Sequence, residues 1–233
     1  VKQRNKLLNK GLQPHLLTMT ATPIPRTLAL TLHGDLDVSQ LDELPPGRTP
    51  ITTQLISPNE KKYAYDLIRS EINKGHQIYV VLPLIEESEK LELSSAVDVY
   101  HHLSTDIFSD YNVELLHGKM KSVEKQEVIS NFLNKKTDIL VSTTVIEVGV
   151  DVPNASVMLI EDSDHFGLAQ LHQLRGRVGR GGANSYCLLS HQNKNKLSRQ
   201  RLEVLVNSND GFEISEIDLR LRGPGQVLGT KQS

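Results

Sequence analysis

The sequence predicts an α/β protein in which a parallel β-sheet carries helices on both faces. From residue 51 onward, short apolar segments alternate with segments whose apolar residues recur at helical spacing. Strands separated by helices in this rhythm form parallel sheets with right-handed crossovers. The segment Gln77–Leu84 is a continuous apolar strand, as expected where helices cover both faces of a sheet. The 233 residues, 38% of them hydrophobic, suffice for one large domain with appendages or for two small domains.

The expected strands are short and mostly apolar. They are Leu16–Met19, Ile51–Ile56, Gln77–Leu84, Val113–Leu116, Asp138–Thr144, Ser156–Glu161 and Ser185–Ser190. The strand that starts at Asp138 ends in the hydroxyl side chains of Ser142, Thr143 and Thr144. Short polar side chains at the carboxyl end of a parallel strand lie where α/β sheets bind ligands, so this strand end is a candidate site.

Helices are expected between these strands. Ser57, Pro58 and Glu60 form a capping box with Pro at the first helical position, and Gly75 suits the end of that helix. The other expected helices are Ser94–Phe108 after an acidic surface loop at Glu86–Glu92, one beginning at Ser122, Lys194–Asn207 and Phe212–Leu221. The residues expected to face the core are Ala64, Leu67, Ile68, Ile72, Val128, Ile129, Phe132, Leu133, Leu197, Leu202, Leu205 and Val206.

A row of polar side chains is expected near the last strand. Arg177 and Arg180 follow Gln173 by four and seven residues, so on a helix all three lie along one face. Guanidinium groups keep their charge and offer planar, bidentate donors suited to phosphate oxygens. Gly176 and Gly179 leave space for a backbone or a ligand to come close. A solvated basic helix is the alternative, but each glycine costs a helix roughly 1 kcal/mol relative to Ala.

Charge is unevenly distributed although the net charge is only −2. Arg175–Arg201 contains seven Lys and Arg residues and no acid, whereas acids cluster at Glu86–Glu92. The one cysteine, Cys187, lies in an apolar run and should be a buried core residue. No signal peptide or membrane-spanning run is visible, so we expect a cytoplasmic protein with no membrane partner.

Metal and acidic-box chemistry are not expected. His101, His102, His165 and His172 lack the Cys clusters and the His-Glu-x-x-His spacing of metal sites, so they should be core or surface histidines. Asp162-Ser163-Asp164-His165 imitates an acidic box, but we assign it no catalytic role.

Several short motifs occur in an order that resembles the superfamily 2 helicases and translocases. Thr20-Ala21-Thr22-Pro23 resembles the third motif, Thr143 through Asp151 the fifth, and Gln173 through Arg180 the sixth. The resemblance implies a RecA-like lobe. The end of the chain, from Asp218 to Ser233 with its Gly-Pro-Gly loop, resembles the translocation hairpin and loop shared by the RecG family of branched-DNA translocases and the transcription-repair coupling factors.

This resemblance implies four segments and a set of site residues. The segments are the tail of a first motor lobe at 1–32, a linker at 33–48, a second RecA-like lobe at 49–191, and a translocation hairpin and loop at 192–233. The implied catalytic residues are Arg180, Arg177 and Gln173; nucleotide contacts are Gly149, Asp151, Arg177 and Arg180; nucleic-acid contacts are Thr143, His117, Gly118 and Lys119; coupling residues are Thr20, Thr22, Glu147, Arg220, Arg222 and Gln232. A capped turn is the alternative role for His117.

The chemistry implied is half of a composite ATP site. No Gly-x-x-x-x-Gly-Lys-Ser/Thr phosphate loop occurs in the 233 residues, so ATP and Mg²⁺ should be held mainly by a first lobe outside this sequence. We expect Arg180, as the arginine finger, and Arg177 to reach the γ-phosphate from the open carboxyl edge of the sheet, accessible and not buried in ion pairs. The fragment should be inactive alone and should bind no ATP.

The expected function is that of the second motor lobe of a double-stranded DNA translocase that remodels stalled forks and Holliday junctions. Its partners would be branched or double-stranded DNA, gripped at phosphates, together with an N-terminal wedge domain and the first lobe of a longer chain. Replacing Arg222 or Gln232 should then spare DNA-stimulated ATPase and abolish fork remodelling. The alternatives are the motor of a coupling factor and a non-catalytic docking module for nucleic acid or protein.

Overall fold

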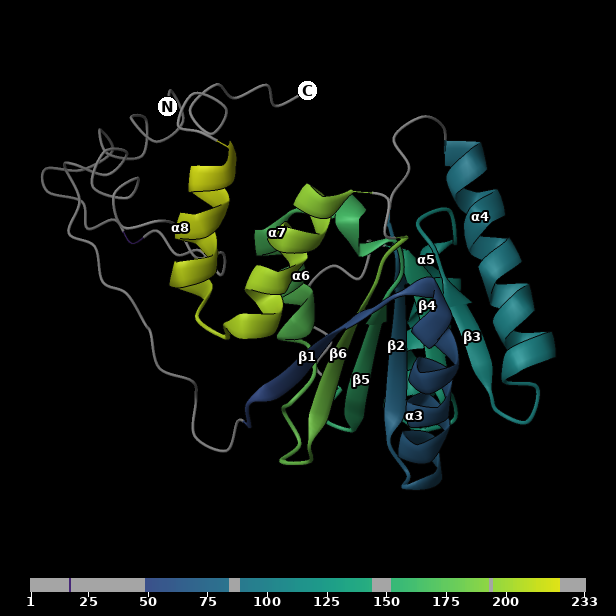
Figure 1. Cartoon of the computed structure of the whole chain (residues 1–233). Coiled ribbons are helices and arrows are strands. Elements are labelled where there is room, and N and C mark those ends of the chain that lie inside the picture. Colours follow the sequence, from purple (N-terminus) through teal and green to yellow (C-terminus); the bar gives the residue numbers. More distant parts are fainter. Residues whose placement is uncertain (1–16, 18–48, 84–88, 144–151, 193–194, 223–233) are drawn as a thin grey trace, which may run out of the picture.

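The fold is a six-stranded parallel sheet, seen in the computed structural model, which describes residues 17, 49–83, 89–143, 152–192 and 195–222 (Figure 1). The strands are β1 (Ile51–Ile56), β2 (Gln77–Leu82), β3 (Val113–Leu116), β4 (Ile139–Thr143), β5 (Ala155–Ile160) and β6 (Ser185–Ser190). Their order across the sheet is β1-β6-β5-β2-β4-β3, and every neighbouring pair is parallel. The predicted parallel α/β sheet is therefore confirmed.

Helices cover both faces of this sheet, as predicted (Figure 1). One face packs against α3 (Lys61–Asn73) and α4 (Glu89–His101), and the other packs against α5 (Ser122–Leu133), α6 (Leu168–Arg175), α7 (Lys196–Asn207) and α8 (Gly211–Arg222). All six residues of β2 are buried: Ile78 and Val80 point to one core, Tyr79 and Val81 to the other. This two-sided burial is why β2 has no polar alternation.

The predicted helix start after β1 is confirmed. The Glu60 carboxylate accepts hydrogen bonds from the backbone N–H of Ser57 at 3.2 Å and from its hydroxyl at 2.7 Å. A single 3₁₀ turn, η1 (Pro58–Glu60), precedes α3. Gly75 ends this segment with φ of +90°, a conformation that favours glycine.

The helix after the acidic segment begins earlier than predicted. α4 starts at Glu89 and not at Ser94, so residues 89–92 belong to the helix and not to a surface loop. Glu, Lys and Leu are good helix formers, and acids near a helix N-terminus interact favourably with its dipole. The segment then continues as a π-helix, η2 (His102–Ile107), up to the buried Phe108.

Three of the predicted core residues lie at the surface. Leu133 is 47% exposed, Leu197 62% and Val206 38%, whereas Phe132, Leu202 and Leu205 are buried. Neighbouring positions on a helix differ by about 100°, so burial of Phe132 and Leu205 turns Leu133 and Val206 away from the core. Cys187 is buried as predicted, and burial raises the pKa of its thiol to about 12.

The two C-terminal helices pack on the lobe. Leu202 and Leu205 of α7 and Ile214 of α8 belong to the same core as the sheet residues Met158 and Leu189. The predicted helical hairpin is thus present and extends the hydrophobic core; the segment boundaries near residues 48 and 191 stay predictions. Within the described ranges, no helix is both long and apolar enough to cross a bilayer. The strand expected at Leu16–Met19 lies outside the described residues, except for exposed Leu17.

Candidate functional site

The predicted site residues lie at two opposite edges of the sheet. Thr143 ends β4 and His117 follows β3, so both lie at the carboxyl edge. Arg177 and Arg180 follow α6, which carries the chain back to the start of β6 at Ser185. The expectation that the arginines face the carboxyl edge is therefore wrong. A helix that follows a parallel strand returns the chain to the amino edge, where the next strand must begin.

The expected helical row is also wrong. α6 ends at Arg175 with Gly176 as its C-cap, so Arg177 and Arg180 lie on a loop that we call the arginine turn, residues 176–183. Gly179 has φ of +81° there, which an α-helix cannot contain. The Nε–H of Arg180 donates to the carbonyl oxygen of Gly176 at 3.2 Å. Gln173 and Arg180 are exposed and Arg177 is half-buried, so a ligand could reach all three.

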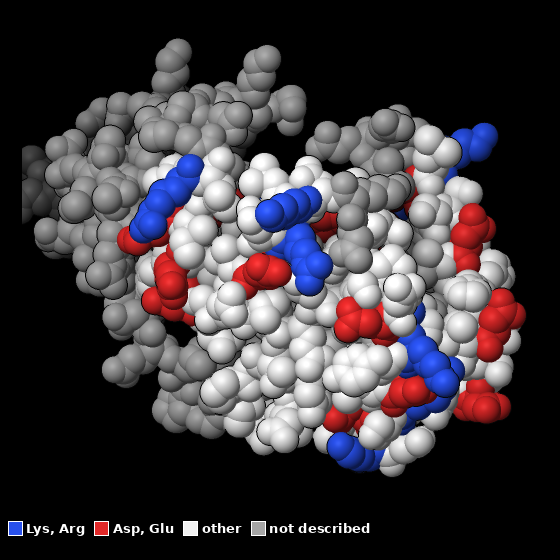
Figure 2. All heavy atoms as spheres, in the orientation of Figure 1, with Lys and Arg blue, Asp and Glu red and all other residues white. Residues whose placement is uncertain are grey.

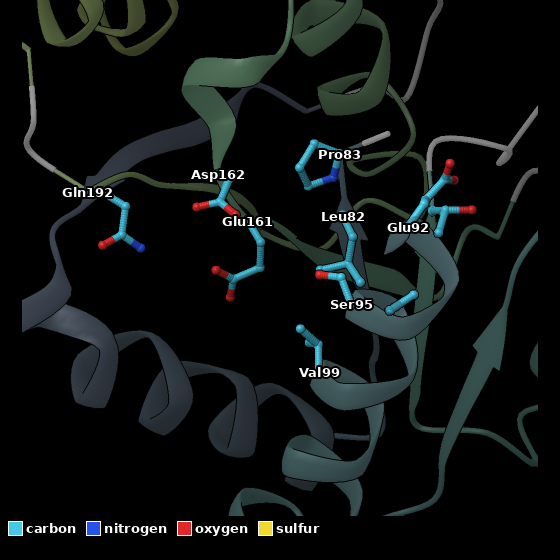
Figure 3. Close-up of a pocket in the computed structure, with 10 residues that line it drawn as sticks. Leu82, Pro83, Glu92, Ser95, Val99, Glu161, Asp162 and Gln192 are labelled. Carbon is cyan, nitrogen blue, oxygen red and sulfur yellow. The ribbon is translucent and has the colours of Figure 1, made fainter. Parts of the chain in front are cut away.

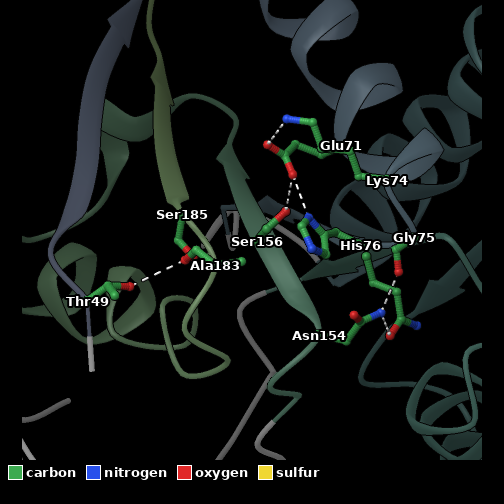
Figure 4. A network of polar contacts seen from close by, with 10 residues as sticks. Thr49, Glu71, Lys74, Gly75, His76, Asn154, Ser156, Ala183 and Ser185 are labelled. Carbon is green, nitrogen blue, oxygen red and sulfur yellow. Dashed lines mark hydrogen bonds and ion pairs between the residues drawn. The ribbon is translucent and has the colours of Figure 1, made fainter. Parts of the chain in front are cut away.

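The arginine turn is seated tightly on the amino edge. A Cβ on Gly179 would lie 3.0 Å from Cγ1 of Ile51 and 3.3 Å from the carbonyl oxygen of Thr49. A Cβ on Gly181 would come closer to the carbonyl oxygen of Pro153 than the 3.0 Å that real side chains keep. The hydroxyl of Thr49 donates to the carbonyl of Ala183 at 3.3 Å (Figure 4). The close approach expected at Gly179 is present, and that at Gly181 escaped sequence reasoning because its neighbour is distant in the chain.

Arg175 is a buried structural residue and not part of a basic surface. Its guanidinium donates to the carbonyl oxygen of Leu205 at 2.6 Å and to the hydroxyl of Thr53 at 3.2 Å, and it lies 2.8 Å from Nδ1 of His172. Burial lowers the pKa of Arg175 from its ordinary value. This one side chain therefore joins α6 to β1 and to the last turn of α7.

At the C-terminal end of the predicted basic run, Arg199 and Arg201 are also bound to other groups of the protein. Arg201 donates to the carbonyl oxygens of Asp164 at 2.7 Å and Phe166 at 2.9 Å, and Arg199 pairs with Glu203 at 3.4 Å. Figure 2 shows Lys and Arg side chains scattered among acids over the face in view. The acid-free stretch of sequence does not make one continuous basic patch on this face.

A small pocket lies at the carboxyl edge beside Thr143 (Figure 3). Its volume is about 130 Å³, and its polar lining includes Glu92, Glu161, Asp162 and Gln192. Glu161 pairs with Lys61. Thr143 is 1% exposed, and among the described residues its hydroxyl has no hydrogen-bond partner. Three carboxylates make this pocket a poor site for a phosphate, so a DNA backbone would have to meet Thr143 outside it.

The His117 turn combines an ordered imidazole with two exposed residues. Its Nδ1 accepts a hydrogen bond from the backbone N–H of Lys119 at 3.2 Å, which confirms the capped-turn role. Burial lowers the pKa of His117, in keeping with a neutral, accepting ring at pH 7. Gly118 and Lys119 are exposed. A contact of this turn with nucleic acid stays a prediction.

The remaining predicted residues contribute little to the described structure. Arg220 is on α8, with Nη2 4.0 Å from Glu216, and Arg222 ends that helix. Thr20, Thr22, Glu147, Gly149, Asp151 and Gln232 lie outside the described residues. In the parts of the chain that the structure describes, no group of three His, Cys, Asp or Glu side chains could hold a metal ion.

Two family models match this chain. The model of the helicase conserved C-terminal domain matches residues 60–182, which include β2 to β5, the His117 turn and most of the arginine turn. The chain belongs to this family. The model of ATP-dependent DNA helicase RecG, domain 3, C-terminal, matches residues 208–233, which include α8.

Relatives extend the match to the whole chain. It is 61% identical to ATP-dependent DNA helicase RecG of Synechocystis sp. over 233 residues, all of this chain and 28% of the relative. It is 50% identical to RecG of Thermotoga maritima over 232 residues, 100% of this chain and 30% of the relative. The chain thus spans about a third of the length of the curated relatives it matches.

Solved structures agree with this assignment. A structure of RecG bound to a three-way DNA junction is 47% identical, with a TM-score of 0.78, and the match covers 95% of this chain and 29% of that one. Domain 2 of the DEAD-box helicase Mss116p, bound to an RNA duplex, is 20% identical with a TM-score of 0.54 over 68% of this chain and 61% of its own. At that identity the second likeness shows the RecA-like fold alone.

Proposed function

We propose that this chain is the second motor lobe of an ATP-dependent double-stranded DNA translocase that remodels stalled forks and Holliday junctions in the cytoplasm during recombination and repair. The observation that carries the proposal is the accessible arginine turn. It carries Arg177 and Arg180 on a loop whose glycines pack closely on the sheet edge, and the sequence contains no phosphate loop of its own. Phosphate-binding arginines without a phosphate loop suit one half of a shared nucleotide site.

The residues present fit a nucleotide phosphate approached from outside. Arg180 is exposed, and its Nε–H donates to the carbonyl oxygen of Gly176, which orients the guanidinium plane. ATP with Mg²⁺, held mainly by the first lobe, would supply the phosphoryl chemistry. Arg180 would then donate hydrogen bonds and positive charge to the phosphate oxygens, and Arg177 would share this charge. Gly149 and Asp151 complete the proposed nucleotide contacts, and Gln173 completes the proposed catalytic residues.

DNA contact belongs to the opposite edge of the sheet. The exposed Gly118 and Lys119 beside His117 can meet a phosphate backbone, which requires no base readout. The buried guanidinium of Arg175, the last residue of α6 before the arginine turn, bonds to Leu205 of α7. A shift of α6 or α7 is therefore transmitted to the other helix. This link supports a coupling role for the segment from Arg220 to Gln232, with Thr20, Thr22 and Glu147 as its proposed partners. Similarity to RecG at residues 208–233 favours this reading over that of a coupling factor.

The decisive experiment replaces Arg180 with Ala in a full-length protein that carries this sequence. We expect kcat for DNA-stimulated ATP hydrolysis to fall by about 10³ to 10⁵, as for other arginine fingers, while DNA affinity stays within about twofold. Turnover and binding to a synthetic three-way junction would be measured in parallel.

Arg199→Ala is the matched control, because Arg199 is an exposed arginine whose side chain pairs with Glu203 on α7. It should keep normal turnover. Wild-type ATPase in Arg180→Ala would reject the assignment of the finger and, with it, the composite site.

A further inference from the structure

The arginine turn packs on the short segment 152–154 that leads into β5. Gly181 packs directly on the carbonyl oxygen of Pro153, so closely that even a methyl group in place of its hydrogen would collide with this backbone atom. No positive φ is recorded at Gly181, in contrast to +81° at Gly179 and +78° at Gly182. Gly181 is therefore required there by contact and not by backbone conformation.

The segment that receives Gly181 is itself anchored by Asn154 (Figure 4). The side-chain amide of Asn154 donates to the carbonyl oxygen of Gly75 at 2.9 Å and lies 3.1 Å from Oε1 of Gln77. Gly75 lies in the connection between α3 and β2, and Gln77 is the first residue of β2. Asn154 thus fixes the position of Pro153 relative to the centre of the sheet.

Asn154 is held rigidly because its partner Gln77 is itself buried and hydrogen-bonded. Gln77 is 3% exposed, and its Nε2 donates to the carbonyl oxygens of Phe132 at 2.6 Å and Thr137 at 2.7 Å. Beside it, the buried carboxylate of Glu71 lies 2.6 Å from Nδ1 of His76 and accepts from the hydroxyl of Ser156 at 3.1 Å (Figure 4). Satisfied buried polar networks of this kind hold one geometry.

We propose that Gly181 and Asn154 are positioning residues that set where Arg180 stands, acting through Pro153. The contact from Gly181 to Pro153 fixes the height of the arginine turn above the amino edge, and Asn154 fixes Pro153. This inference rests on the proposed function, because it assumes that Arg180 serves a phosphate. It assigns no contact with nucleotide to either residue.

The test compares Gly181→Ala with wild type in the full-length protein. The added methyl group must lift the arginine turn from Pro153, and small misplacements at a reaction centre cost about 10²-fold. We expect kcat for ATP to fall about ten- to hundredfold while KM changes less than about threefold. We also expect the affinity ratio between ADP with aluminium fluoride, which imitates the transferring phosphoryl group, and ADP alone to fall by a similar factor.

Arg199→Ala, at an exposed arginine of α7 outside the arginine turn, is the control. It should keep both kcat and the affinity ratio. Thermal midpoints of both variants should stay within a few degrees of wild type, since Gly181→Ala shifts a surface turn and leaves the core intact.

Asn154→Ala independently tests the contact between the arginine turn and Pro153. It removes the donor to Gly75 and Gln77, and we expect faster hydrogen exchange at residues 176–183 together with a lower affinity ratio. Asn134→Ala, at an exposed asparagine that bonds Ser130 at 3.3 Å, is its control.

The outcomes separate this inference from the proposed function. If Arg180→Ala abolishes turnover but Gly181→Ala keeps normal kcat and a normal affinity ratio, positioning is rejected and the finger stands. If Gly181→Ala lowers the thermal midpoint and leaves the affinity ratio unchanged, its role is structural and the inference is again overturned. If Arg180→Ala turns over normally, both fail.

Discussion

Three arginines within six residues have different roles because their surroundings differ. Arg175 is buried and is held by Leu205, Thr53 and His172, whereas Arg180 is exposed on a turn and Arg177 is half-buried. A guanidinium used inside the fold cannot also serve a ligand. The number of arginines in this stretch therefore exceeds the number whose positive charge can reach a phosphate.

Burial also separates residues of α7 that look equivalent in sequence. Leu202→Ala should lower the free energy of unfolding by about 2–5 kcal/mol, because Leu202 is fully buried in the core that α7 shares with α6 and the sheet. Leu197→Ala, at a position 62% exposed on the same helix, should change it by less than about 0.5 kcal/mol. Urea denaturation of both variants checks this. Equal losses would mean that Leu197 has a buried partner.

At the scale of elements, the end of α6 decides the shape of the site. The helix stops at Arg175 because Gly176 caps it and Gly179 takes a positive φ, and the chain then turns under β1. A helix continued to Arg180 would have carried the arginines past the sheet. The turn instead packs, through Gly179 and Gly181, against the start of β1 and the segment before β5.

The link between α6 and α7 is a second property of elements. Arg175→Lys should destabilise the protein by about 1–3 kcal/mol, because an ammonium group lacks the planar fork whose Nη1 reaches Leu205 and Thr53 while its Nη2 lies against His172. Arg199→Lys, at an exposed pair with Glu203, is the control and should change stability by less than about 0.5 kcal/mol. Thermal unfolding measures both. A stable Arg175→Lys variant would show that the buried hydrogen bonds contribute little.

For the whole molecule, the sheet separates the two proposed functional regions. Its carboxyl edge carries the His117 turn and the acidic pocket, and its amino edge carries the arginine turn. The proposed contacts with DNA and nucleotide therefore lie at opposite edges of the same sheet and on different strands, with β3 and β4 on the DNA side and β1 and β5 on the nucleotide side.

The hairpin of α7 and α8 is part of this body. Truncation after Gln192 would expose the core that Leu202, Leu205 and Ile214 cover, and would remove the Leu205 carbonyl from Arg175. Burying each such side chain contributes about 1.5–3 kcal/mol, and total stabilities are only about 5–15 kcal/mol. We expect loss of the cooperative unfolding transition and binding of a hydrophobic dye. Truncation after Arg222, which retains both helices, should keep the transition; an equally cooperative shorter chain would contradict a shared core.

Sequence alone determined the parallel sheet, the capping box at Ser57, the buried Cys187 and the set of motif residues, because apolar periodicity and local turn chemistry are properties of neighbouring residues. It also led to the arginines, but not to their edge of the sheet or to the end of their helix. Those depended on Ile51 and Pro153, which lie more than twenty residues away along the chain and meet the arginine turn only after folding. Burial of Arg175 and exposure of Leu133, Leu197 and Val206 were likewise decided by tertiary packing. Which face of a helix is buried depends on the elements that pack against it.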